Sequence, residues 1–381
     1  MGMIFLGILI LMIGSIALFK NEKQVIGEKE QANEKYLAEQ MEKLFIPGFY
    51  YTMYQQTSVT SKFLEEKLMS MFPISRYVNE KEEQVTEVED SLTYAMILEM
   101  QAKDEERLSE DLLALENSVD TSSEVITETS IEKLRDFQYL LSKYYTVDST
   151  TTINEEQLNV DALLSRDMHL DTSTKGPKVL IFHTHSQESF VDSKAEDAGT
   201  SIVGIGKYLA EKLNEKGIET IHHDGIYDLV DGKLDRSKAY ELSEIGVREI
   251  LNQYPSIEVV IDLHRDGVSE NLHLVTEVDG KPTAKIMFFN GLSRTKTNGD
   301  IAYLKNPYIQ DNLSFSFQMQ LASENLYPGL ARKIYLKGYR YSLHMMPKSL
   351  LIEAGAQTNT VQEMKNAMDL LANILYRVLS E

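Results

Sequence analysis

The sequence contains no cysteine among its 381 residues. Disulfide bonds and thiolate metal sites are therefore excluded, and any metal ion must be held by histidine and carboxylate side chains. Basic residues are also scarce, since 38 Lys and Arg stand against 59 Asp and Glu and give a formal net charge of −21. A chain this acidic repels phosphate backbones, so its composition argues against nucleic acid as a partner.

One long uncharged segment stands near the start of the chain. Residues 3–19, MIFLGILILMIGSIALF, are followed at once by KNEK. Their length is at the short end of the roughly 17–25 residues that span a membrane. A cleaved signal peptide would have a basic flank before the segment and a small-residue cleavage pattern after it. The sequence shows neither feature. We therefore expect a transmembrane signal anchor over 1–19 in the cell membrane with the remainder extracytoplasmic, although Lys20 and Lys23 lie on the wrong flank for the positive-inside rule.

The composition of the sequence and the spacing of its apolar residues then change twice. Residues 20–145 are acidic and space their apolar residues three and four apart, which indicates a mainly helical spacer that includes a short amphipathic helix near 131–141. Residues 146–174 are rich in Ser, Thr and Asp, a composition typical of a linker. From 175 to 381, apolar strand-like segments alternate with helical patterns. This alternation predicts an α/β domain with a mixed, largely parallel sheet flanked by helices.

Four apolar segments of the last region predict strands: VLIFHTH, VVIDLHRD, IMFFNG and SLLIEAG. The final helix is expected to begin with a capping box formed by Thr360 and Glu363. Another helix is expected to end at Gly217, because four apolar residues before that glycine share one helical face. These residues are Ile202, Ile205, Leu209 and Leu213.

Three of the predicted strands end in metal-capable or acidic residues. His185 and Glu188 follow the first, His264 ends the second, and Glu353 ends the fourth. Ligands of open α/β sheets bind beyond the carboxyl ends of the strands, so these side chains would converge if the strands are neighbours. Two histidines and one glutamate leave an open position for water, as catalytic Zn²⁺ requires. Glu353 is then the candidate acid/base that passes a proton from the water to the leaving nitrogen.

Each of these motifs is weak when taken alone. Paired H-x-x-E residues are frequent on polar loops, and a histidine at a strand end is commonly only hydrogen-bonded. His183 shares a face with His185 if the first strand continues, so either histidine could bind the metal while the other supports it. The pairing with Glu188 favours His185. Because all three motifs stand at the ends of predicted strands in a chain without cysteine, the zinc interpretation is the preferred one.

Several other polar residues invite alternative interpretations. Arg265 and Asp266 could orient ligands or hold an anionic group, or they could form a structural ion pair. Residues 222–224, HHD, read as a polar strand end. His344 could contact a substrate, and Arg332 could clamp a substrate carboxylate or lie on the surface.

Four motifs in order resemble the stage II sporulation protein P family. They read VLIFHTHSQESF, VVIDLHRDG, YPGLARKIYLKGYRYSLHMMPKSLLIEAGAQTNT and NAMDLLANIL, and the resemblance covers roughly residues 145–381. It implies a membrane-anchored zinc N-acetylmuramoyl-L-alanine amidase that remodels septal peptidoglycan during engulfment in endospore-forming bacteria. It also implies an endopeptidase activity, a partner in the lytic transglycosylase stage II sporulation protein D, and a fold similar to zinc amidases and zinc carboxypeptidases.

Carried over by position, the resemblance assigns His185, Glu188 and His264 to the metal and Glu353 to acid/base chemistry. The chain departs from the family at 340–345, where it reads RYSLHM and some members read RYNQDL. This difference concerns the substrate side and leaves the metal set untouched.

The leading hypothesis is a hydrolase that cuts the amide between the muramoyl lactyl group and L-alanine, with Arg265 steadying the oxyanion. One alternative is a zinc carboxypeptidase or endopeptidase acting on stem peptides, which would need a carboxylate-binding arginine such as Arg332 or Arg340. Another is a membrane-tethered scaffold with a structural metal. A structural site is normally closed by four protein ligands, and the sequence offers three.

Overall fold

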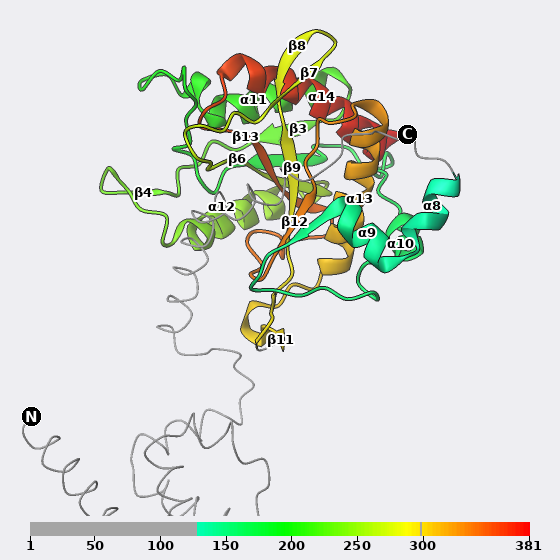
Figure 1. Cartoon of the computed structure of the whole chain (residues 1–381). Coiled ribbons are helices and arrows are strands. Elements are labelled where there is room, and N and C mark those ends of the chain that lie inside the picture. The colour runs from blue at the N-terminus through cyan, green and yellow to red at the C-terminus, as the bar shows by residue number, and fades with distance from the viewer. Residues whose placement is uncertain (1–127, 298) are drawn as a thin grey trace, which may run out of the picture. The chain divides into compact units, whose positions relative to one another are not determined.

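The computed structural model describes residues 128–297 and 299–381 (Figure 1). The expected membrane anchor over 1–19 lies outside the described residues, as does the expected spacer up to residue 127. Among the helices that the structure describes, none is both long and apolar enough to cross a bilayer.

Helices and strands alternate along the described chain. In order, the elements are α8 (Glu128–Leu134), α9 (Phe137–Tyr144), β1 (Tyr145–Val147), α10 (Val160–Ser165), β2 (Val179–Phe182), η1 (Ala198–Thr200), α11 (Ile202–Glu215), β3 (Thr220–His222), β4 (Leu229–Val230), β5 (Lys233–Leu234), α12 (Ala239–Gln253), β6 (Val259–Asp266), β7 (Val275–Val278), β8 (Lys281–Ala284), β9 (Ile286–Gly291), β10 (Arg294–Thr295), β11 (Gly299–Asp300), η2 (Ala302–Leu304), α13 (Ile309–Leu326), β12 (Ile334–Lys337), β13 (Ser349–Ala356) and α14 (Val361–Ser380). The four predicted strands correspond to β2, β6, β9 and β13.

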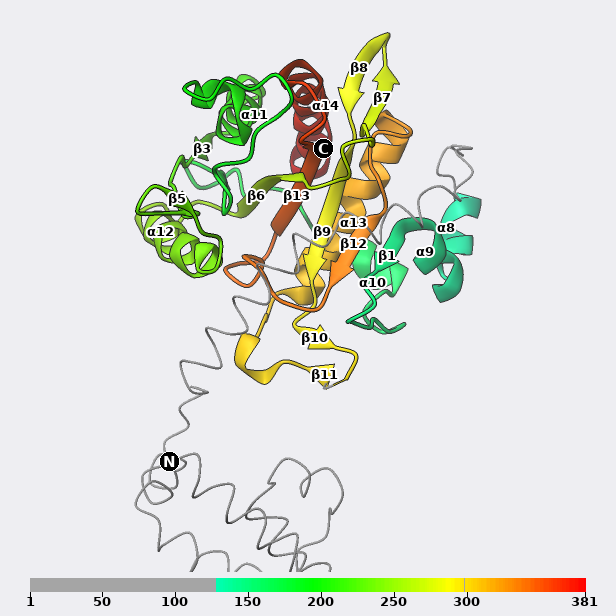
Figure 2. The same ribbon diagram turned by 60° about the vertical axis from the view of Figure 1, so that its left-hand side comes forward.

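Seven strands form the central sheet, in the order β1-β12-β9-β13-β6-β2-β3. Five of its six strand contacts are parallel, and only β13 and β9 run antiparallel. The expected mixed, largely parallel sheet flanked by helices is therefore confirmed. Because β2, β6 and β13 run in the same direction, their carboxyl ends meet on one side of the sheet. Figure 2 shows β6 and β13 side by side.

Successive side chains of these strands face two different layers. Ile261 and Leu263 of β6 are buried in the core that the strands share with α11, α13 and α14. Val260 faces the other way and packs with Val247 of α12. Full burial of such a side chain contributes roughly 1.5–3 kcal/mol relative to exposure. The alternation therefore holds each strand with one defined face toward each layer.

The two helix boundaries predicted from sequence are confirmed. The four apolar residues expected on one face of α11 are all 0% exposed. Gly217 follows α11 with φ +84°, the left-handed conformation that commonly ends helices. At the start of α14, the Thr360 side chain accepts a hydrogen bond from Glu363 N–H, and the Glu363 carboxylate accepts one from Thr360 N–H.

Residues interpreted as the end of a spacer and a linker belong to this same core. β1 pairs in parallel with β12 at the edge of the sheet, and α10 packs on α13. Within the expected linker over 146–174, Leu163 is completely buried. The polar composition has a local reason, because residues such as Asn159 cap helices: its Oδ1 accepts from Ala162 N–H at 2.9 Å.

The single amphipathic helix expected near 131–141 is divided in two. α8 ends at Leu134, and α9 begins after Asp136, whose side chain accepts a hydrogen bond from Tyr139 N–H. A side-chain cap of this kind starts a new helix and permits the change in direction.

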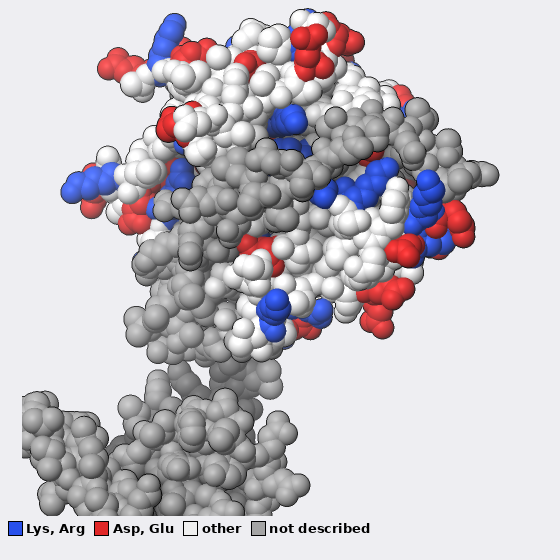
Figure 3. Space-filling model, in the orientation of Figure 1, with Lys and Arg blue, Asp and Glu red and all other residues white. Residues whose placement is uncertain are grey.

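Acidic and basic side chains are mixed on the face of the molecule in Figure 3. Basic groups lie in the centre of this face as well as near its margin. The acidic excess of the whole chain therefore does not produce a uniformly negative surface over the described residues.

A buried asparagine joins β13 to α14. Asn359 is 0% exposed. Its Oδ1 accepts from Ala356 N–H at 2.9 Å, while its Nδ2 donates to the Leu274 carbonyl at 3.1 Å and to Glu363 Oε2 at 2.9 Å. Asn359 therefore ties the end of the strand, the segment before β7 and the first turn of α14 together.

Replacement of Asn359 should destabilise the fold. Asn359→Ala should lower the free energy of unfolding by about 2 kcal/mol or more, because each buried polar group left without a partner costs roughly 1–3 kcal/mol. Urea denaturation followed by circular dichroism measures the change. Gln362→Ala, which removes a surface hydrogen bond to Asn366, is the control and should cost less than about 0.5 kcal/mol. Equal losses in the two variants would contradict this account.

Candidate metal centre

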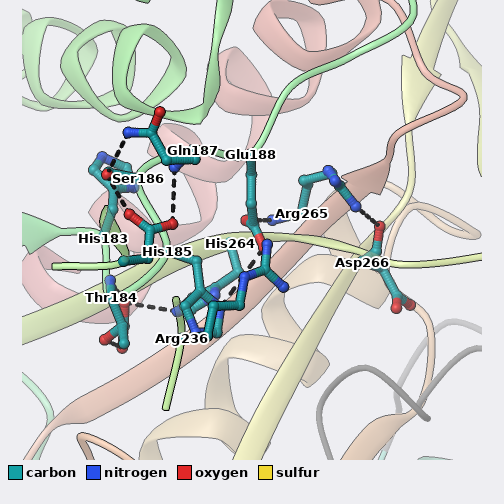
Figure 4. A network of polar contacts seen from close by, with 12 residues as sticks. His183, Thr184, His185, Ser186, Gln187, Glu188, Arg236, His264, Arg265 and Asp266 are labelled. Atoms are coloured by element: carbon teal, nitrogen blue, oxygen red, sulfur yellow. Dashed lines mark hydrogen bonds and ion pairs between the residues drawn. The ribbon is translucent and has the colours of Figure 1, made fainter. Parts of the chain in front are cut away.

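The carboxyl ends of β2 and β6 bring three buried, metal-capable side chains together. His185, Glu188 and His264 each offer one ligand atom, and these atoms lie within 4.8 Å of one another (Figure 4). The three residues are 1%, 3% and 1% exposed. His185 Nδ1 lies 3.8 Å from Glu188 Oε1, and the two imidazole rings meet edge to face with centroids 5.0 Å apart. The residues singled out in the sequence thus form a buried group that could bind a metal.

His183 does not join this group. β2 ends at Phe182, so the alternation that would place His183 and His185 on one face does not continue. His183 Nδ1 lies 2.7 Å from the Leu263 carbonyl oxygen, and its Nε2 lies 3.0 Å from His222 Nε2. Both ring nitrogens of His183 are therefore engaged elsewhere. Gly206 of α11 makes room for this ring, since a Cβ at that position would lie 2.4 Å from His183 Nε2.

A buried carboxylate orients His264. Asp262 is 1% exposed, and its Oδ1 lies 2.7 Å from His264 Nε2. Thr184 donates to the same carboxylate through its N–H at 2.9 Å and its hydroxyl at 2.6 Å, and Ser342 donates through its hydroxyl at 2.7 Å. Because Nε2 of His264 is engaged, Nδ1 is the ring nitrogen left for a metal. Metal-binding histidines typically direct their second ring nitrogen at such a carboxylate.

The surroundings move the pKa values of the two histidines in opposite directions. Burial lowers the pKa of His185 well below its usual value, and the nearby charges of His264, Arg236 and Arg265 lower it further. Burial also disfavours the charged form of His264, but the charge and hydrogen bond of Asp262 outweigh this and raise the pKa of His264 well above its usual value. Burial therefore favours a neutral imidazole at His185, which is the form that ligates a metal. Asp262 favours the protonated form of His264, so a metal ion bound to this ring would have to displace a proton.

Glu353 lies next to this group on the neighbouring strand. β13 pairs with β6 so that Glu353 is directly opposite His264. Ile352 and Ala354 belong to the core on the helical side, so the alternation of the strand puts Glu353 on the face that His264 occupies. Glu353 is 5% exposed. The sequence expectation that Glu353 and the ligand residues converge agrees with this arrangement.

Arg265 contacts the site through its backbone. Its N–H donates to Glu188 Oε2 at 2.8 Å, while its Nη1 donates to the Asp266 carbonyl at 3.2 Å. In Figure 4 the Arg265 side chain extends toward Asp266. The Asp266 carboxylate accepts from Arg332 Nη1 at 2.6 Å, and both side chains are buried. Arg332, considered as a carboxylate clamp or a surface residue, is therefore a buried partner of Asp266.

The other histidines considered in the sequence lie in structural contacts. β3 ends at His222, and His223 Nε2 lies 2.5 Å from the Tyr227 hydroxyl, so the expected polar strand end is confirmed. His344 Nε2 lies 3.0 Å from Glu244 Oε2, and Arg340 Nη2 lies 3.6 Å from the same oxygen.

Sequence reasoning missed two contributions to the centre. Asp262 precedes His264 by two residues, and the period of a strand would have placed both on one face. The second contribution comes from the segment around β4 and β5. Asp228 accepts from the Ser186 hydroxyl at 2.7 Å, and Arg236 Nη2 lies 3.5 Å from Glu188 Oε1. No spacing rule links residues of this irregular segment to the loop after β2.

Comparison with known proteins identifies the family. The family model of stage II sporulation protein P matches residues 59–376, which is more than half of the chain. The chain belongs to the stage II sporulation protein P family. Stage II sporulation protein P of Bacillus subtilis (strain 168) is 22% identical over 244 residues, which cover 58% of this chain and 58% of that protein. This family member therefore spans less than two thirds of the length of that relative.

Two solved structures are similar to this chain at a low level. One is N-acetylmuramoyl-L-alanine amidase AmiC2 of Nostoc punctiforme, at 16% identity and a TM-score of 0.32, covering 54% of this chain and 98% of AmiC2. The other is the CwlD amidase of Clostridioides difficile in complex with the GerS lipoprotein, at 16% identity and a TM-score of 0.32, covering 52% of this chain and 94% of CwlD. Similarity of this degree carries no argument about activity, which has to come from the site.

Substitution of the two neighbouring histidines should separate a ligand from a supporting residue. His185→Ala should lose stoichiometric zinc, because it removes one of three ligand atoms. His183→Asn should retain zinc, because His183 contacts the Leu263 carbonyl and His222 instead. Metal content after dialysis, with circular dichroism to confirm folding, gives the answer. Folded His183→Asn protein without zinc, beside His185→Ala protein that keeps it, would reverse the assignment.

Proposed function

We propose that this protein is a zinc-dependent peptidoglycan hydrolase that cleaves the amide between N-acetylmuramic acid and L-alanine of the stem peptide during sporulation. The observation that carries the proposal is the buried group of His185, Glu188 and His264 with Glu353 in register beside it. Membership of the stage II sporulation protein P family supports peptidoglycan as the substrate. The same proposal includes a fold of the zinc amidase type for the catalytic domain.

The residues present fit a zinc ion. Two imidazoles and one carboxylate form a donor set that Zn²⁺ accepts, and three protein ligands suit a catalytic site. The Asp262 carboxylate contacts Nε2 of His264 and leaves the other ring nitrogen for the ion, an arrangement that is common for zinc-binding histidines. When bound, the ion would polarise the amide carbonyl and lower the pKa of a water molecule to about 7.

The side chains of the chain itself would do the remaining work. Glu353 takes the proton from the attacking water and delivers it to the leaving nitrogen, a role that requires its place beside the ligands. Asp262 holds the ring of His264 in one orientation. The charge-stabilising role predicted for the Arg265 side chain stays a prediction, while its backbone N–H helps to hold Glu188.

The alternatives have less support. Carboxypeptidase or endopeptidase action on stem peptides needs an arginine pocket for a carboxylate, and Arg332 is bonded to Asp266. A scaffold with a structural metal would need a fourth protein ligand, whereas three metal-capable side chains converge within the part of the chain that the structure describes.

The cellular setting belongs to the same proposal. Anchoring in the cell membrane through 1–19, a spacer beginning at residue 20 and an extracytoplasmic catalytic domain would bring the centre to the cell wall. The lytic transglycosylase stage II sporulation protein D would be a partner that cuts the glycan strands of the same substrate.

Digestion of purified peptidoglycan tests the proposed activity. The zinc-loaded protein should release intact stem peptides with a free L-alanine amine, and a chelator should abolish the release. Mass spectrometry of the soluble fragments identifies the bond that is cut. Shortened stem peptides would establish peptidase action instead, and absence of fragments despite bound zinc would favour the scaffold.

Glu353→Gln should separate metal binding from turnover. The variant should keep its zinc, because Glu353 is not among the three ligands, but kcat should fall at least 10²-fold with the loss of proton transfer. Glu215→Gln, a change at the exposed partner of Lys212, is the control. Wild-type turnover in Glu353→Gln protein would remove Glu353 from the acid/base role.

A further inference from the structure

Arg236 approaches the metal group from a segment that the sequence pattern does not connect with it. Its Nη2 lies 3.5 Å from Glu188 Oε1, and its side chain is 18% exposed. Its Nε is buried and has no hydrogen-bond partner among the described residues. Figure 4 shows the side chain ending at Glu188, beside His264. The guanidinium therefore lies at the ligand group and retains hydrogen-bonding capacity.

The segment that carries Arg236 is fastened to the ligand-bearing loop. Asp228 is 0% exposed and accepts from the Ser186 hydroxyl at 2.7 Å and from Gln187 N–H at 3.1 Å. Asp235 N–H in turn donates to the Asp228 carbonyl at 2.9 Å and closes the β4–β5 hairpin. Arg236 follows directly. Its position is thus fixed by the same loop that presents Glu188.

Arg265 is the other arginine beside Glu188, and its side chain is directed elsewhere. Its Nη1 donates to the Asp266 carbonyl, and only its backbone N–H reaches the Glu188 carboxylate. Of the two arginines, Arg236 is the one whose guanidinium contacts a ligand oxygen.

The charges at Glu188 indicate what Arg236 would bind. Glu188 is the only anion among the three ligand residues, and the guanidinium is paired with it. A divalent cation ligated by Glu188 would neutralise part of the negative charge of this carboxylate. The Arg236 guanidinium would then lie close to a second positive charge, with less negative charge to offset the two. Two such charges in a buried site repel strongly and together favour an anion between them.

We infer that Arg236 is a catalytic residue that stabilises negative charge on the carbonyl oxygen of the substrate amide, the role predicted from sequence for Arg265. The amide as substrate rests on the proposed function, whereas the anion-binding role does not depend on it.

The step balances with the groups already named. Water adds to the carbonyl carbon and gives a proton to Glu353, while the carbonyl π pair moves to oxygen. The Arg236 guanidinium donates hydrogen bonds to that oxygen as its negative charge develops. The carbonyl then re-forms, the C–N bond breaks, and the proton held by Glu353 passes to the leaving nitrogen.

The test compares Arg236→Ala and Arg236→Lys with wild type in the full chain. Lys233→Ala is the matched control, since it removes one positive charge from the exposed hairpin of the same segment. Zinc affinity is measured by competition with a chelator. Arg236→Ala should bind zinc as tightly as wild type or up to about tenfold more tightly, because a like charge has been removed. A loss of more than tenfold would show that Arg236 only positions Glu188, and would overturn the inference.

The second measurement uses acetohydroxamate as an anionic probe of the zinc-loaded protein, by titration calorimetry. Arg236→Ala should weaken its binding at least tenfold, Arg236→Lys should weaken it less, and Lys233→Ala should leave it unchanged. Unchanged affinity in Arg236→Ala would overturn the inference. Both measurements are independent of hydrolysis, so a wild-type protein that fails to cleave peptidoglycan would contradict the proposed function alone.

If wild-type protein cleaves peptidoglycan, kcat supplies a third readout. Loss of one donor to a developing oxyanion costs about 10²–10³-fold in kcat, so Arg236→Ala should lose at least 10²-fold with little change in KM. A change confined to KM would identify Arg236 as a residue of ground-state substrate binding and would overturn the catalytic role.

Discussion

The register between β6 and β13 is the constraint on which the centre depends. In this register Glu353 lies opposite His264, while Leu263 and Ile352 on the other face enter the helical core. A slip of one residue would exchange the faces of β13 and drive Glu353 into the apolar layer. Burial of an unpaired carboxylate there would cost several kcal/mol. The apolar residues that hold the sheet to its helices therefore also hold the candidate acid/base beside the ligands.

Asp262 extends this constraint from the sheet to the loops. A buried carboxylate is tolerated when hydrogen-bond donors surround it, and Asp262 receives them from the end of β2 through Thr184, from β6 through His264 and from the segment before β13 through Ser342. Ser342 lies where this chain departs from the family pattern. The departure at 340–345 thus includes a residue that donates to Asp262, the carboxylate that orients the candidate ligand His264, as well as the substrate side that the sequence suggested.

The parts of the site that could be predicted from sequence follow from strand periodicity. His185, Glu188, His264 and Glu353 stand at the ends of apolar runs, and parallel strands bring such ends together. Periodicity does not show where a strand stops or which distant strand it joins. β2 stops at Phe182, so the assumed common face of the two histidines after it does not form. The polar composition of 146–174 likewise did not predict β1 and α10, because these elements are held by contacts with distant parts of the chain, β12 and α13.

The position of Arg236 also shows why net charge is a poor guide to this site. The chain carries a formal charge of −21, which by itself would disfavour an anionic ligand. Charges farther away than a Debye length, about 8 Å at physiological ionic strength, are largely screened at the surface. A guanidinium 3.5 Å from a buried ligand oxygen acts over a shorter distance and with less screening. The local field at the candidate centre is therefore set by the charges within a few ångströms of it, among them the Arg236 guanidinium and the Glu188 carboxylate.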